Sequence, residues 1–130
     1  DKGDRRPLGV GAGSLALFCS LSDAQRAAVC RVNKSWLADY GMSEDELAEE
    51  YDFFKEKGYA RNQGGVVSGM SAIAVPVITA SGQSVAALAI GAINDRMEQS
   101  RIDDLLLPGL KREARRLAGR FNALEKEQNK

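Results

Sequence analysis

The sequence predicts an α+β fold in which an antiparallel sheet is flanked by helices and followed by one long C-terminal helix. Three observations lead to this prediction. Glycine and capping signals delimit helices up to residue 58, and two β-rich runs joined by a tight turn follow them. The C-terminal residues then carry an apolar stripe at helical spacing.

A glycine-rich loop is expected near the start of the chain. Gly9, Gly11 and Gly13 stand at alternate positions, and inside a helix each would cost about 1 kcal/mol relative to alanine. The apolar residues 14–19 that follow predict a short helix. The glycines are therefore expected to form a loop that leads into a helix N-terminus.

Two capping boxes predict where the next helices begin. They are Ser22–Gln25 and Ser43–Glu46, in which a serine and the side chain three residues later satisfy each other's backbone N–H groups. The first opens a helix to about Val32, followed by a further turn or two up to Gly41. The second opens a helix that Gly58 stops.

After these helices the hydrophobic period changes to that of strands. Residues 59–60 start a strand, and residues 61–69 form a glycine-broken loop. Two β-rich runs over 70–79 and 84–93 are joined by a hairpin turn at 80–83. The second run is almost entirely small and branched apolar residues, which predicts a strand covered on both faces.

The C-terminal part is predicted to be helical. Residues 100–104 fit one or two turns, and Pro108 suits the first turn of a new helix, where its missing N–H costs nothing. The opposite face is basic, but interleaved glutamates favour a solvated face over a nucleic-acid contact. The apolar stripe of this helix is Leu110, Ala114, Leu117, Ala118, Phe121 and Leu124.

Composition limits the function. The 130 residues suffice for one domain, and 18 Lys plus Arg balance 18 Asp plus Glu. Zero net charge argues against a domain that grips nucleic-acid phosphates, and no apolar run approaches the ~20 residues that span a bilayer. The chain has no histidine, which removes His-dependent nucleophiles, bases and metal sites. Catalysis and cofactors are therefore not expected.

The glycine loop is the most informative candidate site. Its backbone lets a ligand approach closely, and the helix N-terminus offers unpaired N–H groups and a partial positive charge. Residues 11–14 therefore suit a carboxylate or a phosphate. Their spacing is neither the dinucleotide-binding pattern nor a Walker A motif. The alternative is a tight turn, the commoner use of isolated glycines.

The remaining candidates have structural explanations. Cys19 and Cys30 are expected to be buried and inert, with a redox role as the alternative. The acidic run over 43–50 could hold a metal ion, but a solvated helix face is favoured. Aromatic residues between Trp36 and Phe54 are expected to be core or interface anchors.

Three segments carry a resemblance to a known family. They are Arg6–Leu17, then Lys57–Ala60, then Met70–Val77 with Gly82 and Val85–Ile90. In their order and spacing they resemble the effector-binding domain of IclR-type bacterial transcription regulators. The resemblance covers nearly the whole chain.

This resemblance implies a GAF-like effector-binding domain over residues 1–127, followed by a tail at 128–130. The first strands of the sheet and the winged helix-turn-helix that contacts DNA would precede it. Members of the family assemble as homodimers or homotetramers and act as cytoplasmic repressors or activators. Their effectors are often small organic acids, including aromatic ones, and neither a membrane nor a cofactor is implied.

The resemblance also implies the site. The family uses loop-to-helix N–H groups, which match residues 11–14, and strand positions that fall at Asn62, Ala72, Ala89 and Gly91. Members that bind small acids carry an acid, a thiol and hydroxyls at those strand positions. The expectation here is a roomier, apolar pocket for an aromatic or aliphatic carboxylate. The expected effector-binding residues are Val10, Gly11, Ala12, Gly13, Ser14, Leu17, Asn62, Met70, Ala72, Ala89 and Gly91.

Two alternatives remain open beside a ligand-sensing domain that changes DNA binding allosterically. The first is a GAF-like enzyme such as a Cys-dependent reductase of small sulfoxides, which needs a pocket-facing thiol of lowered pKa. The second is an assembly-only module that keeps the fold without a working pocket.

Overall fold

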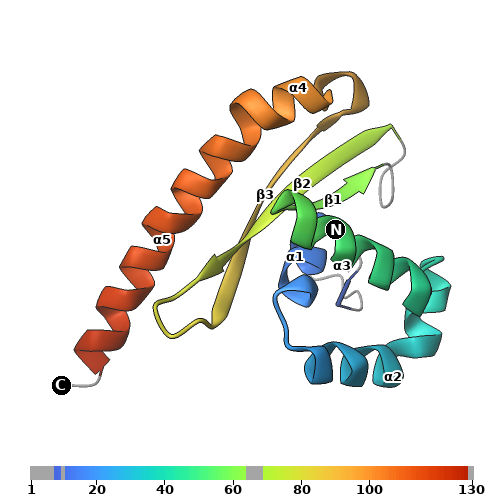
Figure 1. Cartoon of the computed structure of the whole chain (residues 1–130), viewed down its shortest axis with the longest axis horizontal. Coiled ribbons are helices and arrows are strands. Elements are labelled where there is room, and N and C mark those ends of the chain that lie inside the picture. The colour runs from blue at the N-terminus through green and yellow to red at the C-terminus, as the bar shows by residue number, and fades with distance from the viewer. Residues whose placement is uncertain (1–7, 10, 64–68, 129–130) are drawn as a thin grey trace.

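The computed structural model describes residues 8–9, 11–63 and 69–128, and it confirms the α+β prediction (Figure 1). Three helices precede a three-stranded sheet, and one long helix follows it. The first helices are α1 (Ala12–Cys19), α2 (Asp23–Asp39) and α3 (Glu44–Lys57). The strands are β1 (Ala60–Gln63), β2 (Met70–Ile78) and β3 (Ser84–Ile93). The C-terminal elements are η1 (Asn94–Arg96), α4 (Gln99–Arg101), η2 (Ile102–Leu106) and α5 (Leu107–Gln128).

The antiparallel sheet has the order β1-β2-β3 and separates two hydrophobic clusters. Successive residues of β2 alternate between the clusters, as the pleat of a strand requires. Ala74 packs on the side of α1, whereas Ile73 and Val75 pack on the side of α5. Figure 1 shows α1 and α3 on one side of the sheet and α5 running along the other.

The α1 side of the core is built from small residues. Ala12 and Ala16 of α1 share one cluster with Ala60 and Ala74 of the sheet, and Ala16 and Ala74 are both fully buried. Alanine side chains are short, so the helix backbone can lie closer to the sheet backbone than leucine side chains would allow. The helix α1 contacts all three strands.

The α5 side is built from larger residues. Tyr59 is buried there together with Val77, and its ring meets Phe53 edge-to-face at 5.3 Å between centroids. The Gln99 amide donates a hydrogen bond to the Tyr59 hydroxyl at 3.1 Å. Leu110, Ala114 and Ala118 of the predicted stripe complete this cluster, which also includes the half-buried Leu117 and Phe121, whereas Leu124 is exposed.

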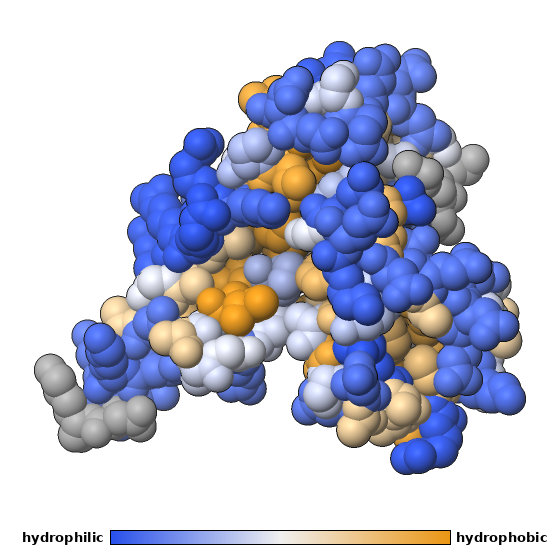
Figure 2. Space-filling view, in the orientation of Figure 1, coloured by the Kyte–Doolittle hydropathy of each residue, from blue (hydrophilic) through white to orange (hydrophobic). Residues whose placement is uncertain are grey.

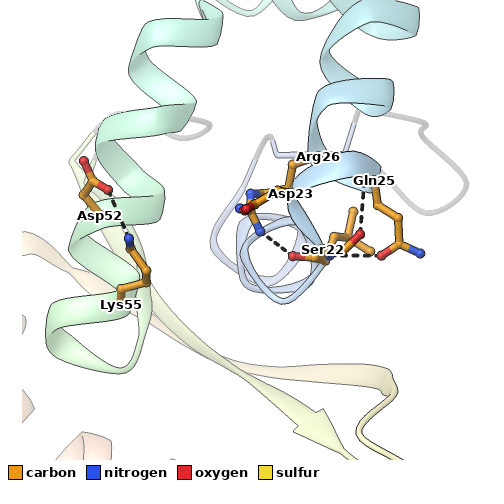
Figure 3. A network of polar contacts seen from close by, with 7 residues as sticks. Ser22, Asp23, Gln25, Arg26, Asp52 and Lys55 are labelled. Atoms are coloured by element: carbon orange, nitrogen blue, oxygen red, sulfur yellow. Dashed lines mark hydrogen bonds and ion pairs between the residues drawn. The ribbon is translucent and has the colours of Figure 1, made fainter.

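The first capping box forms as predicted (Figure 3). The Gln25 N–H donates to Ser22 Oγ at 3.2 Å, and the Ser22 N–H donates to Gln25 Oε1 at 3.0 Å. Arg26 donates to the Asp23 carboxylate beside it. The second box forms only in part: the Glu46 N–H donates to Ser43 Oγ at 3.1 Å, and the return bond is not formed.

The helix α2 is longer than the sequence predicts as one piece. It continues without a break from Asp23 to Asp39, through the expected boundary near Val32. Gly41 then ends it as predicted, with a positive φ of 71°. The Gly41 and Met42 N–H groups donate to the carbonyls of Ala38 and Leu37, which is the Schellman arrangement.

Two features differ from the sequence predictions. Residues 61–63 belong to β1 instead of a loop, because they pair with Ser71–Ile73. The expected coverage of β3 on both faces is wrong: none of its ten residues is buried, since β3 lies at the edge of the described sheet. Pro108 lies in the first turn of α5, as predicted, and a π-helical turn at 102–106 joins this helix to α4.

None of the helices in the described part of the chain is long and apolar enough to cross a membrane.

We predict that Ser22→Ala destabilises the chain by about 1 kcal/mol, because the Gln25 N–H in the first turn of α2 loses its side-chain acceptor. The matched control is Ser35→Ala, which changes the same side chain at an exposed position inside α2 and is expected to be neutral or slightly stabilising. Urea unfolding measures both. Equal midpoints for the two variants would contradict a stabilising role of the cap.

Candidate functional site

The N-terminus of α1 depends on Gly11. This residue is the N-cap of the helix and adopts φ 90° and ψ 151°, a conformation that is essentially restricted to glycine. Its carbonyl accepts the first intrahelical bond from the Leu15 N–H at 2.8 Å. No side chain caps this helix, so the N–H groups of its first turn lack the side-chain acceptor that α2 and α3 have.

Ser14 ties the entering loop to the helix. Its Oγ accepts a hydrogen bond from the Gly9 N–H at 2.9 Å. Gly9 itself is buried against α3, because a Cβ at this position would come within 2.9 Å of Leu47 Cδ2. The Ser14 oxygen thus holds the loop as an acceptor, and its O–H and backbone N–H are the donors that this residue can offer a ligand.

The strand residues expected in the site share one face of the sheet. Asn62 pairs with Ala72 and Ala72 pairs with Gly91, so these three residues form one row across the strands. Met70 and Ala89 lie two positions along β2 and β3, respectively, which keeps them on the same face. This face is the one that α1 covers, because Ala72 packs against its cluster.

Part of this face is open. Ala74 is fully buried under α1, whereas Met70 is 40% exposed. Ala89 and Gly91 are exposed as well. We call these open residues, with Ala72, the apolar shelf. Ile93 pairs with Met70 and is 52% exposed, so it extends the shelf. It was not among the expected site residues, although its alternation with Gly91 and Ala89 places it on this face.

One of the expected residues is not brought into this arrangement, and another is not described. Leu17 is half-buried and points away from Ala12 and Ala16, because it is rotated about the α1 axis by about 140° from the first and about 100° from the second. Val10 lies outside the described residues. Ala72 and Ala89 also line cavities, and neither of these cavities includes a residue of 11–14.

The two cysteines are buried and free. Burial raises the pKa of the Cys19 thiol to about 12; nearby Arg26 lowers it less than burial raises it, and Glu50 raises it further. Burial also raises the pKa of Cys30, with a contribution from Glu44. A thiol with a raised pKa is protonated at neutral pH and is a poor nucleophile.

Within the described ranges no group of three Cys, Asp or Glu side chains could hold a metal ion. The acidic residues 44–46 and 49 are exposed on α3, and the first three lie in its first turn, where they interact favourably with the helix dipole. They agree with the solvated face that the sequence favoured.

Comparison with known proteins identifies a family for this chain. The family model described as the C-terminal part of the bacterial transcriptional regulator IclR matches residues 2–118. No curated protein sequence matches the chain significantly.

Solved structures of transcription regulators share the fold. A regulator from Rhodococcus sp. RHA1 superposes with a TM-score of 0.77 at 21% identity, over 93% of this chain and 50% of that one. The C-terminal domain of E. coli KdgR gives 0.77 at 23%, over 92% and 74%. The inducer-binding domain of the Acinetobacter PobR transcription factor, a double mutant in complex with 3-hydroxybenzoic acid, gives 0.67 at 26%, over 89% and 67%.

The chain thus spans about half the length of the Rhodococcus regulator. Because the family model covers most of the sequence, the match extends over the loop, the helices and the sheet alike. The chain belongs to the IclR family of bacterial transcriptional regulators, as its C-terminal domain.

Proposed function

We propose that this domain senses a small aromatic or aliphatic carboxylate. The carboxylate accepts hydrogen bonds from the N–H groups at the start of α1, and the apolar body lies on the apolar shelf. The observation that carries the proposal is the uncapped helix start, on the face of the sheet that holds the open shelf. An anion gains from such N–H groups and from the helix dipole together.

The character of the shelf favours an apolar ligand body. Its residues are a methionine, two alanines and a glycine, extended by Ile93, and Asn62 is the polar residue in the row of Ala72 and Gly91. A ligand with many hydroxyls would leave polar groups unpaired there, which costs free energy. PobR, whose inducer-binding domain is similar to this chain, was solved with a hydroxybenzoic acid, and this supports an aromatic acid as the first ligand to test.

For the whole protein we propose that a DNA-binding segment lies outside these residues and that homodimers or homotetramers form in the cytoplasm, where the DNA is. The domain acts by binding and not by catalysis. The ligand changes DNA binding only if it binds one arrangement of the subunits more tightly than another. Light scattering with and without 3-hydroxybenzoate distinguishes this sensing role from an assembly-only module.

We predict that 3-hydroxybenzoate binds the chain in titration calorimetry and that Gly13→Pro weakens this binding about tenfold or more. Proline is tolerated in the first helical turn but removes one N–H, and a hydrogen bond to a charged group contributes about 1.5–3 kcal/mol. The neutral 3-hydroxybenzamide is expected to bind weakly to both proteins.

The matched control is Gly13→Ala, which keeps the N–H and meets no atom within 4 Å of its new Cβ. It is expected to bind 3-hydroxybenzoate as the unchanged chain does. Equal affinities for the proline and alanine variants, with both proteins folded by circular dichroism, would remove the α1 N-terminus from the site.

A Cys-dependent reductase is disfavoured by the pKa of Cys19. With a pKa of about 12, the thiolate fraction at pH 8 is about 10⁻⁴, since each unit is a factor of ten. We predict that iodoacetamide does not modify Cys19 in the folded chain at pH 8 while free glutathione reacts, and that denaturant restores the reaction. Fast alkylation of the folded chain at pH 7, read by mass spectrometry, would revive the reductase hypothesis.

A further inference from the structure

A second hollow lies beside α5, away from the start of α1. The pairing of β1 with β2 ends at Ala60 and Ala74, so within the described residues the rest of β2 has no strand on that side. Pro76, which has no N–H to donate, lies in this stretch. The helices α3 and α5 flank the gap and leave a cavity of about 320 Å³, a size within the range of small-molecule sites.

The walls of this α3–α5 cavity are apolar. Val75, Ala114 and Ala118 are buried residues of its floor, and Phe54 and Ile78 line it from α3 and β2. Ile78 is 46% exposed, so the cavity opens to solvent. Figure 2 shows hydrophobic surface between α5 and α3, with hydrophilic surface on both helices.

Two cations line the cavity, and no carboxylate of the described residues lines it. They are Lys111 and Arg115 of α5, which are four residues apart and therefore on the same side of the helix. Like charges at this spacing repel each other. The ion pair that α5 forms within the described residues joins Arg116 to Glu113 at 3.7 Å and involves neither cation.

The end of α3 offsets only part of this charge. Lys111 Nζ lies 3.1 Å from the position that a Cβ of Gly58 would occupy, so the ammonium stands at the C-terminus of α3. A helix C-terminus is equivalent to about half a negative charge. Two full positive charges exceed it, and the cavity entrance keeps a net positive charge.

We propose that the α3–α5 cavity binds an anionic amphiphile, a carboxylate with an apolar tail. The carboxylate pairs with Arg115 and Lys111, and the tail lies against Val75 and the two alanines of α5. Charge complementarity selects the head group, and the apolar floor selects the tail. This site is separate from the proposed site at α1, with which it shares no residue.

Octanoate titrated into the ¹⁵N-labelled chain tests this proposal by NMR. Three glycine amides report on three places: Gly58 on the α3–α5 cavity, Gly109 on the groove between α5 and β3, and Gly13 on the start of α1. We expect saturable shifts at Gly58. The neutral 1-octanol is expected to bind at least tenfold more weakly there.

Charge variants supply the matched control. Lys111→Gln combined with Arg115→Gln is expected to weaken octanoate binding at least tenfold. Arg112→Gln makes the same change on the same helix, but Arg112 lines the β3 groove instead, and its affinity is expected to stay within twofold of the unchanged chain. Arg115→Gln alone serves if thermal unfolding shows that the double variant is destabilised.

Three results would overturn the proposal: no shift at Gly58 up to millimolar octanoate, equal binding of octanol and octanoate, or equal weakening by Arg112→Gln. Shifts confined to Gly13 would overturn it while favouring the proposed effector site. The effector site itself is tested with 3-hydroxybenzoate, so either proposal can fail without the other.

Discussion

The close contact between α1 and the sheet determines where a ligand can bind. Ala12 and Ala16 meet Ala60 and Ala74 in one cluster, and side chains of this size leave no room for a cavity between the helix and the strands it covers. A ligand on this face must therefore lie beside the helix. That position is open at the shelf, where Met70 and Ala89 are exposed.

Gly11 determines how the N-terminus of α1, packed against the sheet, presents its N–H groups. Its φ of 90° turns the chain into α1 without a capping side chain, whereas the serines that begin α2 and α3 each supply one. Of the three helices that precede the sheet, α2 and α3 thus start with a side-chain acceptor and α1 starts without one. The two faces of the sheet also differ: α1 offers N–H groups to an anion, whereas α5 offers cationic side chains beside its apolar stripe.

Much of the fold could be predicted from the sequence, because hydrogen bonds between residues close in sequence determine where its helices and turns begin and end. The Ser22–Gln25 box, the stop at Gly41 and the hairpin strands all depend on residues close in sequence. The exposure of β3 could not be predicted, because composition reports how apolar a strand is and not where it lies in the sheet. The shared row of Asn62, Ala72 and Gly91 followed from the family resemblance, and the α3–α5 cavity was missed because it joins three distant segments.

A crystal structure of the chain with 3-hydroxybenzoate tests the central claim most directly. The account predicts carboxylate oxygens within about 3 Å of the N–H groups of residues 12–14, with the ring on Ala72 and Gly91. A ring held in the α3–α5 cavity, or a carboxylate that meets no N–H group of α1, would contradict it.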